Sequence, residues 1–189
     1  AKYSRLEISF PIQTVATNPY FPYESNPPTG IDPGVGISVN GLFLAPGQTD
    51  WANARTTPCF YYQPVEERGG GADAALVPVG NREWRCRFSP DAAGNWQYRV
   101  QATDGSGTSQ STSGQFTVSE SSANGFVRVS SSDPRFFEFS NGTAFVAPLV
   151  NLEENSPLNT LNNIRTNISR LGQNGIRFVR WWPTWDSSS

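Results

Sequence analysis

The sequence predicts a mainly β chain, in which an immunoglobulin-like β-sandwich is followed by a βαβ unit. Over roughly the first 120 positions, short runs typical of strands recur between turn residues, and no helical periodicity interrupts them. The last part of the chain instead holds an apolar run, an amphipathic helical stretch and a second apolar run. A length of 189 residues suits one ordinary domain with a further fragment.

The expected amino-terminal strands are separated by loops rich in Gly, Pro, Asn and Ser. The first strand alternates well, with Leu6, Ile8 and Phe10 on one face. About seven short strands within about a hundred residues are typical of an immunoglobulin-like sandwich. We expect them at 3–12, 36–45, 58–65, 76–79, 83–88, 96–102 and 114–119.

The pattern changes after residue 119. Residues 120–125 are polar and predict a linker, so the sandwich is expected to occupy 1–119 and the second part 126–189. A short strand is expected at 126–129. Another at 135–139 leads into a hairpin, because Asn-Gly at 141–142 is a strong two-residue turn signal.

A strand–helix–strand pattern follows this hairpin. The run 144–152 is nearly continuous in apolar residues, as in a strand buried on both faces. Ser156 and Pro157 suit the N-cap and first residue of a helix, and Gly172 and Gly175 its end. The helix has one apolar stripe and precedes a second apolar strand at 176–182, which predicts parallel pairing. The stripe consists of Leu158, Leu161, Ile164, Ile168 and Leu171.

Composition excludes several classes of function. The net charge is −2 and there is no basic run, so nucleic acid is not an expected partner. No apolar stretch is long enough to span a bilayer. The chain has no His and two Cys, which excludes His-dependent triads and zinc clusters, and we expect no cofactor. Charged residues are only 16%, with a Ser-, Thr-, Asn- and Gly-rich polar surface, which favours a secreted, extracellular or periplasmic location.

The two cysteines, Cys59 and Cys86, fall on strands expected to be neighbours or to face across the sandwich. In a secreted protein this placement predicts a disulfide, which would stabilise the fold by roughly 3 kcal/mol through loop entropy. The alternative is a pair of buried thiols in the core.

The aromatic residues divide into core and surface candidates. Trp84, Trp96 and Tyr98 lie on expected central strands, so core packing is favoured over a sugar-stacking platform. Trp51 lies in a polar segment and is a possible exposed sugar contact. Tyr20, Phe21 and Tyr23 lie in a Pro-rich loop and could also present ring faces to a sugar.

Three segments, taken in order, resemble a group of bacterial glycoside hydrolases that includes apiosidase-like and cellulase-like enzymes. They are 84–98 with the motifs WRCRFSP and GNWQY, 136–145 with FFEFSNG, and 171–180 with LGQNGIRFVR. In that group a sandwich domain of unassigned function precedes a (β/α)8 barrel. This sequence departs from the group by having no acidic residue at 60–63 and a Gly-rich insertion at 69–71.

The resemblance implies that 126–189 is the truncated βαβ start of such a barrel. These barrels use two carboxylates on later strands, so no catalytic residue is expected in this chain, whereas the parent enzyme would act on a polysaccharide or oligosaccharide. Barrel active sites form at the carboxyl ends of strands, which places six residues at the parent cleft. They are Glu153, Glu154, Trp181, Trp182, Trp185 and Asp186. The alternative for the two glutamates is a solvated acidic turn near a helix N-terminus.

Three functions remain open at this point. The chain is a non-catalytic accessory domain of a glycoside hydrolase, an autonomous carbohydrate-binding module, or an immunoglobulin-like interaction domain with no sugar role. The βαβ unit favours the first, and a row of coplanar aromatics on one sheet face would favour the second. A lone βαβ unit also leaves apolar faces and edges open, so residues 126–189 are expected to bury them on a second copy of the chain, as a homo-oligomer, or else against the sandwich.

Overall fold

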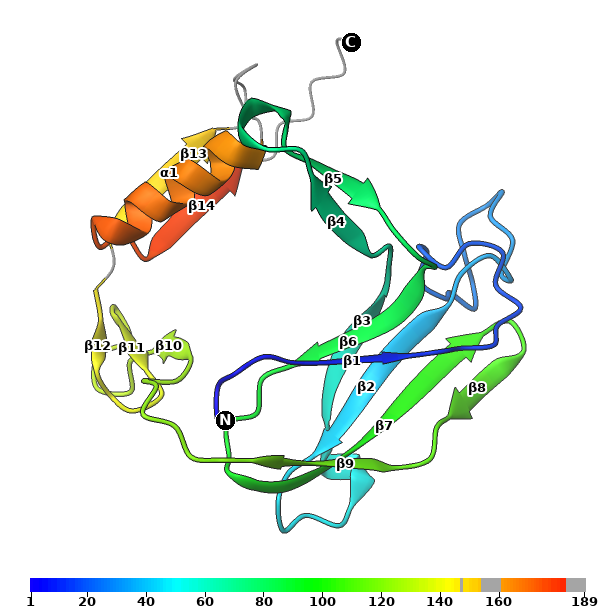
Figure 1. Ribbon diagram of the computed structural model, residues 1–189. Coiled ribbons are helices and arrows are strands. Elements are labelled where there is room, and N and C mark those ends of the chain that lie inside the picture. The colour runs from blue at the N-terminus through cyan, green and yellow to red at the C-terminus, as the bar shows by residue number, and fades with distance from the viewer. Residues whose placement is uncertain (147, 154–160, 183–189) are drawn as a thin grey trace. The chain divides into compact units, whose positions relative to one another are not determined.

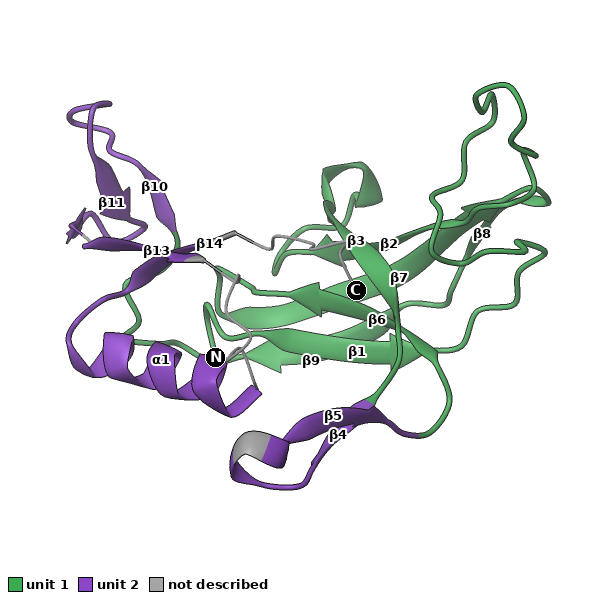
Figure 2. Cartoon of the chain, turned by 90° about the horizontal axis from the view of Figure 1, so that it is seen from above, with its two compact units in different colours: residues 1–64, 80–126 green, residues 65–79, 127–189 purple. Residues whose placement is uncertain are grey.

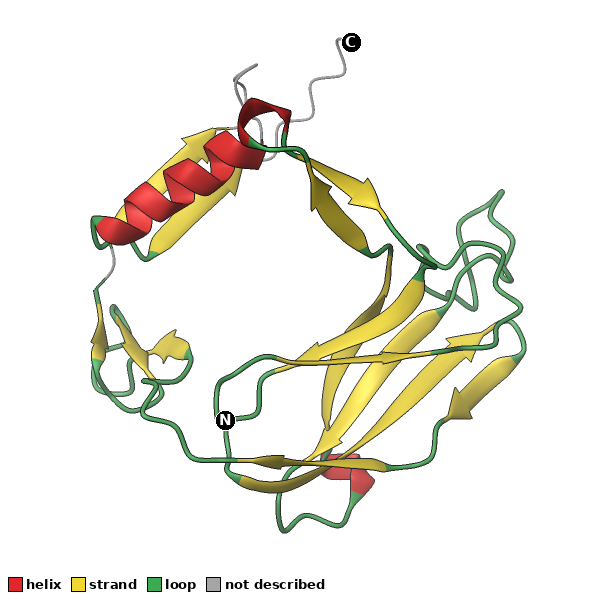
Figure 3. Ribbon diagram, in the orientation of Figure 1, coloured by secondary structure: helices red, strands yellow, loops and turns green. Residues whose placement is uncertain are grey.

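The computed structural model describes residues 1–146, 148–153 and 161–182, and these are mainly β with one α-helix (Figure 3). The predicted mainly β class is therefore confirmed. The chain divides into two compact units (Figure 2). Unit 1 contains 1–64 and 80–126, and unit 2 contains 65–79 together with the chain from 127 onward. Within the described ranges, no helix has the length and apolar character needed to cross a membrane.

An antiparallel sheet of seven strands forms the body of unit 1 (Figure 1). Its strands lie in the order β1-β6-β3-β2-β7-β8, and β9 also pairs with β7. A short 3-10 helix, η1 (Trp51–Asn53), precedes β3. The strands are β1 (Leu6–Phe10), β2 (Ser38–Leu44), β3 (Arg55–Tyr62), β6 (Glu83–Phe88), β7 (Gly94–Asp104), β8 (Gly107–Gln110) and β9 (Gly114–Val118).

Strand β3 joins the two halves of this sheet. Its residues 55–58 pair with β2, and its residues 59–62 pair with β6. Because β3 pairs with β2 at one end and with β6 at the other, strands that a sandwich would divide between two sheets are hydrogen-bonded into one sheet. The immunoglobulin-like arrangement therefore stays a prediction.

The core of unit 1 is aromatic and lies between β2, β6 and β7. Phe43 stacks on Phe88 with 4.0 Å between ring centroids, and Phe88 meets Trp96 edge-on at 5.1 Å. Phe43 and Trp96 are fully buried, and each such side chain stabilises the fold by roughly 1.5–3 kcal/mol. Trp84 is also buried, so the core placement predicted for both tryptophans is confirmed.

Unit 2 contains two hairpins. β4 (Val65–Arg68) and β5 (Ala75–Pro78) form an antiparallel pair around the 3-10 helix η2 (Gly71–Asp73). The second hairpin follows β10 (Val127–Val129) and joins β11 (Phe137–Phe139) to β12 (Ala144–Phe145). Its turn holds Gly142 at φ +84°, a conformation that glycine adopts without strain, so the predicted Asn-Gly turn is confirmed.

The βαβ pattern is also confirmed in unit 2. β13 (Leu149–Glu153) pairs in parallel with β14 (Phe178–Trp182), and α1 (Leu161–Gln173) lies between them in sequence. The helix ends where the Ile176 N–H donates to Leu171 O at 3.0 Å and Gly175 takes a φ of +74°. The predicted cap residues Ser156 and Pro157 lie outside the described residues.

The hairpin β4–β5 was predicted only in part, because the strand expected at 76–79 is β5 but no separate strand was expected at β4. The run 58–65 was expected to be one strand, but it divides into β3 and the start of β4. The hairpin belongs to unit 2 although β3 and β6 of unit 1 flank it in sequence. Arg165 on α1 holds Glu67 on β4 through two bonds, Nη1 to Oε1 at 3.0 Å and Nη2 to Oε2 at 2.6 Å.

Candidate functional site

The predicted cleft residues fall at the carboxyl ends of the parallel strands. In the register of β13 and β14, Glu153 lies opposite Trp182, and Leu152 lies opposite Trp181. The backbone therefore brings three of the six predicted residues to one edge of the sheet. Glu154, Trp185 and Asp186 lie outside the described residues.

Trp51, the predicted surface contact, lies on η1. Asp50 caps η1 by accepting a bond from the Ala52 N–H at 2.9 Å. The guanidinium carbon of Arg99 lies 4.0 Å from the centroid of the Trp51 ring, and Arg99 Nε donates to Ser113 Oγ at 2.8 Å. One face of the indole is thus covered by a fixed cation, which leaves less ring surface for stacking on a sugar.

Cys59 and Cys86 are both free in the structure, so the predicted disulfide is not supported and stays a prediction. Their predicted placement on neighbouring strands is right, since they lie directly opposite each other on β3 and β6. The hydrogen bond with Cys86 and burial raise the pKa of the Cys59 thiol, so it stays protonated.

One face of the sheet carries aromatic rings interleaved with arginines. Phe60 and Tyr62 on β3 meet edge-on at 85°, with 6.1 Å between centroids. Arg87 lies over the Phe60 ring at 4.8 Å, and Arg85 lies over the Tyr62 ring at 4.1 Å. Rings that are perpendicular and covered by cations do not form the coplanar platform expected of a stacking surface for sugars.

A hollow of about 650 Å³ opens beside the start of β6. Its aromatic walls are Tyr61, which is half-buried, and Trp84, whose rings lie 5.3 Å apart. Tyr20 packs edge-on against Tyr61 at 5.5 Å and is 58% exposed. A second hollow of about 380 Å³ shares Pro19, Tyr61 and Trp84 with the first. Ligand pockets commonly have volumes of about 300–1,000 Å³, so both hollows fall in that range.

Charged groups of both signs line the larger hollow. Arg82 lies 5.7 Å over the Tyr20 ring, and its Nε donates to Gln63 Oε1 at 3.2 Å. The Glu83 carboxylate accepts two bonds from Arg85, from Nε at 2.7 Å and from Nη2 at 2.5 Å, both at Oε1. These bonds orient Arg82 as a donor and Glu83 as an acceptor at the rim.

The loop that carries Tyr20 is held at several points along its length. The Asn18 N–H donates to Val35 O at 2.9 Å, and the Ile37 N–H donates to Phe21 O at 2.9 Å. At Gly36 a Cβ would lie 2.1 Å from Pro22 O, so only glycine permits this approach. The aromatic rings of the loop are therefore presented by an anchored backbone.

Asp104 anchors the start of the same loop from the end of β7. It is buried, and its carboxylate accepts bonds from Thr14 Oγ1 at 2.5 Å and the Val15 N–H at 3.1 Å. The Ser106 N–H and Oγ donate to it at 2.8 and 2.6 Å. These bonds, led by those from the Ser106 and Thr14 hydroxyls, lower the pKa of Asp104 to about 2.

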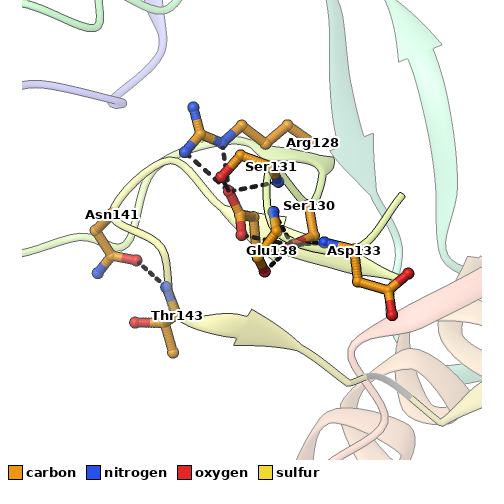
Figure 4. Close-up of polar contacts among 8 residues, drawn as sticks. Arg128, Ser130, Ser131, Asp133, Glu138, Asn141 and Thr143 are labelled. Carbon is orange, nitrogen blue, oxygen red and sulfur yellow. Dashed lines mark hydrogen bonds and ion pairs between the residues drawn. The ribbon is translucent and has the colours of Figure 1, made fainter. Parts of the chain in front are cut away.

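Glu138 organises the hairpin region of unit 2 (Figure 4). Its buried carboxylate accepts bonds from Ser130 Oγ at 2.9 Å and from Arg128 Nε at 3.1 Å. The Ser131 N–H and Oγ both lie 3.3 Å from Oε1. The bond from Ser130 contributes most to lowering the pKa of Glu138, which fits a structural carboxylate.

The carboxyl groups with a shifted pKa all shift in the same direction, toward lower values. Five of them have a lowered pKa, chiefly through hydrogen bonds from arginine, serine or threonine side chains. A general acid for glycoside cleavage needs the opposite shift, so these groups suit structural roles. They are Glu7, Glu67, Asp104, Asp133 and Glu138. In the described part of the chain, no three His, Cys, Asp or Glu side chains gather as metal ligands would.

Sequence reasoning did not single out Tyr61, Arg82 or Glu83 as a group. Tyr61 alternates with its neighbours on a strand, and Arg82 and Glu83 lie at a turn into another strand, so each alone is unremarkable. The β3–β6 register, which pairs Tyr61 with Trp84, brings them together. Tyr20 was considered for its Pro-rich loop, and that composition was the only available signal.

Comparisons with known proteins assign no family to this chain. No family model matches the chain. No curated protein matches it either. A crystal structure of a "putative glycoside hydrolase" from Bacteroides vulgatus ATCC 8482 is similar, with 21% identity and a TM-score of 0.40. The match covers 77% of this chain and 21% of that one, so this chain spans about a fifth of its length.

Proposed function

We propose that this chain is the non-catalytic amino-terminal part of a secreted glycoside hydrolase that acts on polysaccharide. In this proposal, unit 1 is an immunoglobulin-like accessory domain, and β13–α1–β14 begins a (β/α)8 barrel. The observation that carries the proposal is the parallel pairing of β13 and β14 after an antiparallel body. Parallel strands occur almost only in α/β sheets that are covered on both faces.

The position of the candidate cleft supports the same proposal. Glu153, Trp181 and Trp182 lie at the carboxyl ends of the two parallel strands, where barrel enzymes bind substrate. Indole faces stack on sugar rings, and carboxylates accept bonds from sugar hydroxyls. The three sequence motifs that resemble bacterial glycoside hydrolases span both units.

The non-catalytic role is supported by the state of the carboxyl groups. Glycoside hydrolysis requires a protonated carboxyl group beside a second carboxylate. Hydrogen bonds and arginines instead favour the ionised form of Glu7, Glu67, Asp104, Asp133 and Glu138. We therefore assign no catalytic role to these five groups, in keeping with the resemblance, which implies catalytic carboxylates on later barrel strands.

A hydrolysis assay on two forms of the protein tests this assignment. The 189-residue chain is expected to release no reducing sugar from a panel of neutral and acidic polysaccharides. A form that continues beyond β14 is expected to hydrolyse at least one of them. In that form, Trp182→Ala should raise KM, whereas Phe126→Ala, an exposed aromatic of unit 1, should not. Turnover by purified 189-residue chain would contradict the proposal.

A further inference from the structure

The paired hollows beside Tyr61 have the features of a binding site that is separate from the proposed cleft. Both lie wholly in unit 1, whereas Glu153, Trp181 and Trp182 belong to unit 2. We propose that the hollows bind a neutral oligosaccharide segment of a polysaccharide, with the rings of Tyr61 and Tyr20 as apolar walls against the sugar rather than as a coplanar stacking platform. This inference rests on the proposed function, because it concerns the substrate of the same enzyme.

The walls suit the apolar faces of sugar rings. Tyr61 contacts the rings of both Trp84 and Tyr20, so its ring orientation is set before a ligand arrives. Tyr20 and Phe21 remain 58% and 56% exposed, although the loop that carries them is anchored. Exposed rings on an anchored backbone can stack on a ligand with little loss of conformational entropy.

The polar rim suits hydroxyl groups. Arg82 supplies N–H donors, while Glu83 supplies an acceptor, because both bonds from Arg85 go to Oε1. A sugar hydroxyl can donate and accept at once, so adjacent hydroxyls match this pair. Arg82 and Glu83 line the same rim, so a uronate carboxylate drawn to Arg82 would also face the Glu83 carboxylate, which favours a neutral sugar.

The division into two hollows indicates a ligand longer than one sugar. The two hollows adjoin each other, since Pro19, Tyr61 and Trp84 line both of them. Tyr20 and Phe21 line the smaller hollow, whereas Glu83 and Arg82 line the larger one. Consecutive sugar units could therefore occupy consecutive hollows along the same chain.

Affinity electrophoresis tests the site. Native gels would contain neutral polysaccharides of plant, fungal and bacterial origin, each gel with one polymer, and a separate gel would contain polygalacturonate. We expect the wild-type chain to be retarded in at least one neutral gel and not in polygalacturonate. Arg82→Ala should weaken this binding about tenfold, as for the loss of a hydrogen bond to a charged group. Tyr20→Ala should weaken it at least as much.

Arg87→Ala is the matched control. It removes the same charge from the same strand region, but Arg87 bonds Glu7 and lines neither hollow. A second measurement uses oligosaccharides cut from the polysaccharide that retards the chain. When they are titrated into the protein, the backbone amide NMR shifts of residues around Tyr61 and Arg82 should change. Retardation in no neutral gel, retardation only in polygalacturonate, or equal losses for Arg82→Ala and Arg87→Ala would overturn the inference. None of these outcomes affects the hydrolysis assay, whose result bears on the proposed function alone.

Discussion

Asp104 shows, at the scale of a single residue, how hydrogen bonds from uncharged donors can stabilise a buried carboxylate. Asp104 is 6% exposed, and each contact described above comes from a hydroxyl or a backbone N–H. Such donors favour the carboxylate without a salt bridge. The network ties β7 to the loop that carries Tyr20, so one residue links the stability of unit 1 to the shape of the hollows.

We expect Asp104→Asn to lower the free energy of unfolding at pH 7 by about 1–3 kcal/mol, because an amide cannot accept all four bonds. The folded-state pKa of Asp104, about 2, lies below its ordinary value of 3.8. Its contribution is therefore fully present above pH 3.8 and is lost as the pH falls through about 2. Urea unfolding curves at pH 7 and pH 2 measure both effects.

Asp32→Asn is the control for this prediction. Asp32 is exposed, and its Oδ1 accepts one bond from the Gly34 N–H at 2.8 Å, which an amide oxygen can also accept. We expect its free energy of unfolding to change by less than about 0.5 kcal/mol. If the two variants unfolded at the same urea concentration, the anchoring role of Asp104 would be refuted.

At the scale of elements, local patterns predicted strands well but not their partners. The alternation in β1 and the Asn-Gly turn between β11 and β12 depend on neighbouring residues, so the sequence reveals them directly. The change of partner within β3 depends on β2 and β6, which lie far away in sequence. The same limit hid the hollow beside Tyr61, whose walls come from three separate segments.

The prediction of a disulfide also belongs to this scale. Adjacent strands and a composition typical of secretion favoured a bond between Cys59 and Cys86, and the strands are indeed adjacent. Whether two opposed cysteines form a bond depends on the distance between their side chains, which strand assignment alone does not determine. In contrast, the parallel pairing of β13 and β14 follows from connection length, so it was predictable.

The contact between α1 and the β4–β5 hairpin yields a prediction about local stability. Arg165→Gln removes the two bonds to Glu67, so we expect faster amide hydrogen exchange across 65–78 and unchanged exchange in β1 and β6. Mass spectrometry of peptic fragments measures this. The charge-reversed double variant, Glu67→Arg with Arg165→Glu, should restore slow exchange. If Arg165→Gln alone left the exchange rate across 65–78 unchanged, the stabilising role of the contact would be contradicted.

At the scale of the whole molecule, exposed apolar side chains are concentrated in unit 2. They lie on both hairpins, on the strands of the parallel pair and on α1. A two-stranded parallel sheet leaves its outer edges without backbone partners, and such edges favour association with further strands. The large exposed apolar side chains of unit 2 are those of Val65, Leu76, Val127, Val129, Phe136, Phe137, Val146, Leu149, Ile168 and Phe178.

We therefore predict that the 189-residue chain self-associates through residues 126–189. Burying apolar surface stabilises by roughly 25 cal/mol per Å², so several such side chains together supply a substantial driving force. Light scattering coupled to gel filtration should report at least twice the monomer mass at high protein concentration. Phe136→Asp with Val146→Asp should shift the chain toward monomer, because these side chains are 61% and 89% exposed and their loss should not unfold unit 2. Ile31→Asp, at a 53% exposed position in a unit 1 loop, should leave the mass unchanged. A monomeric mass for the wild-type chain across the concentration range would exclude self-association and leave burial of these apolar faces within the chain as the explanation.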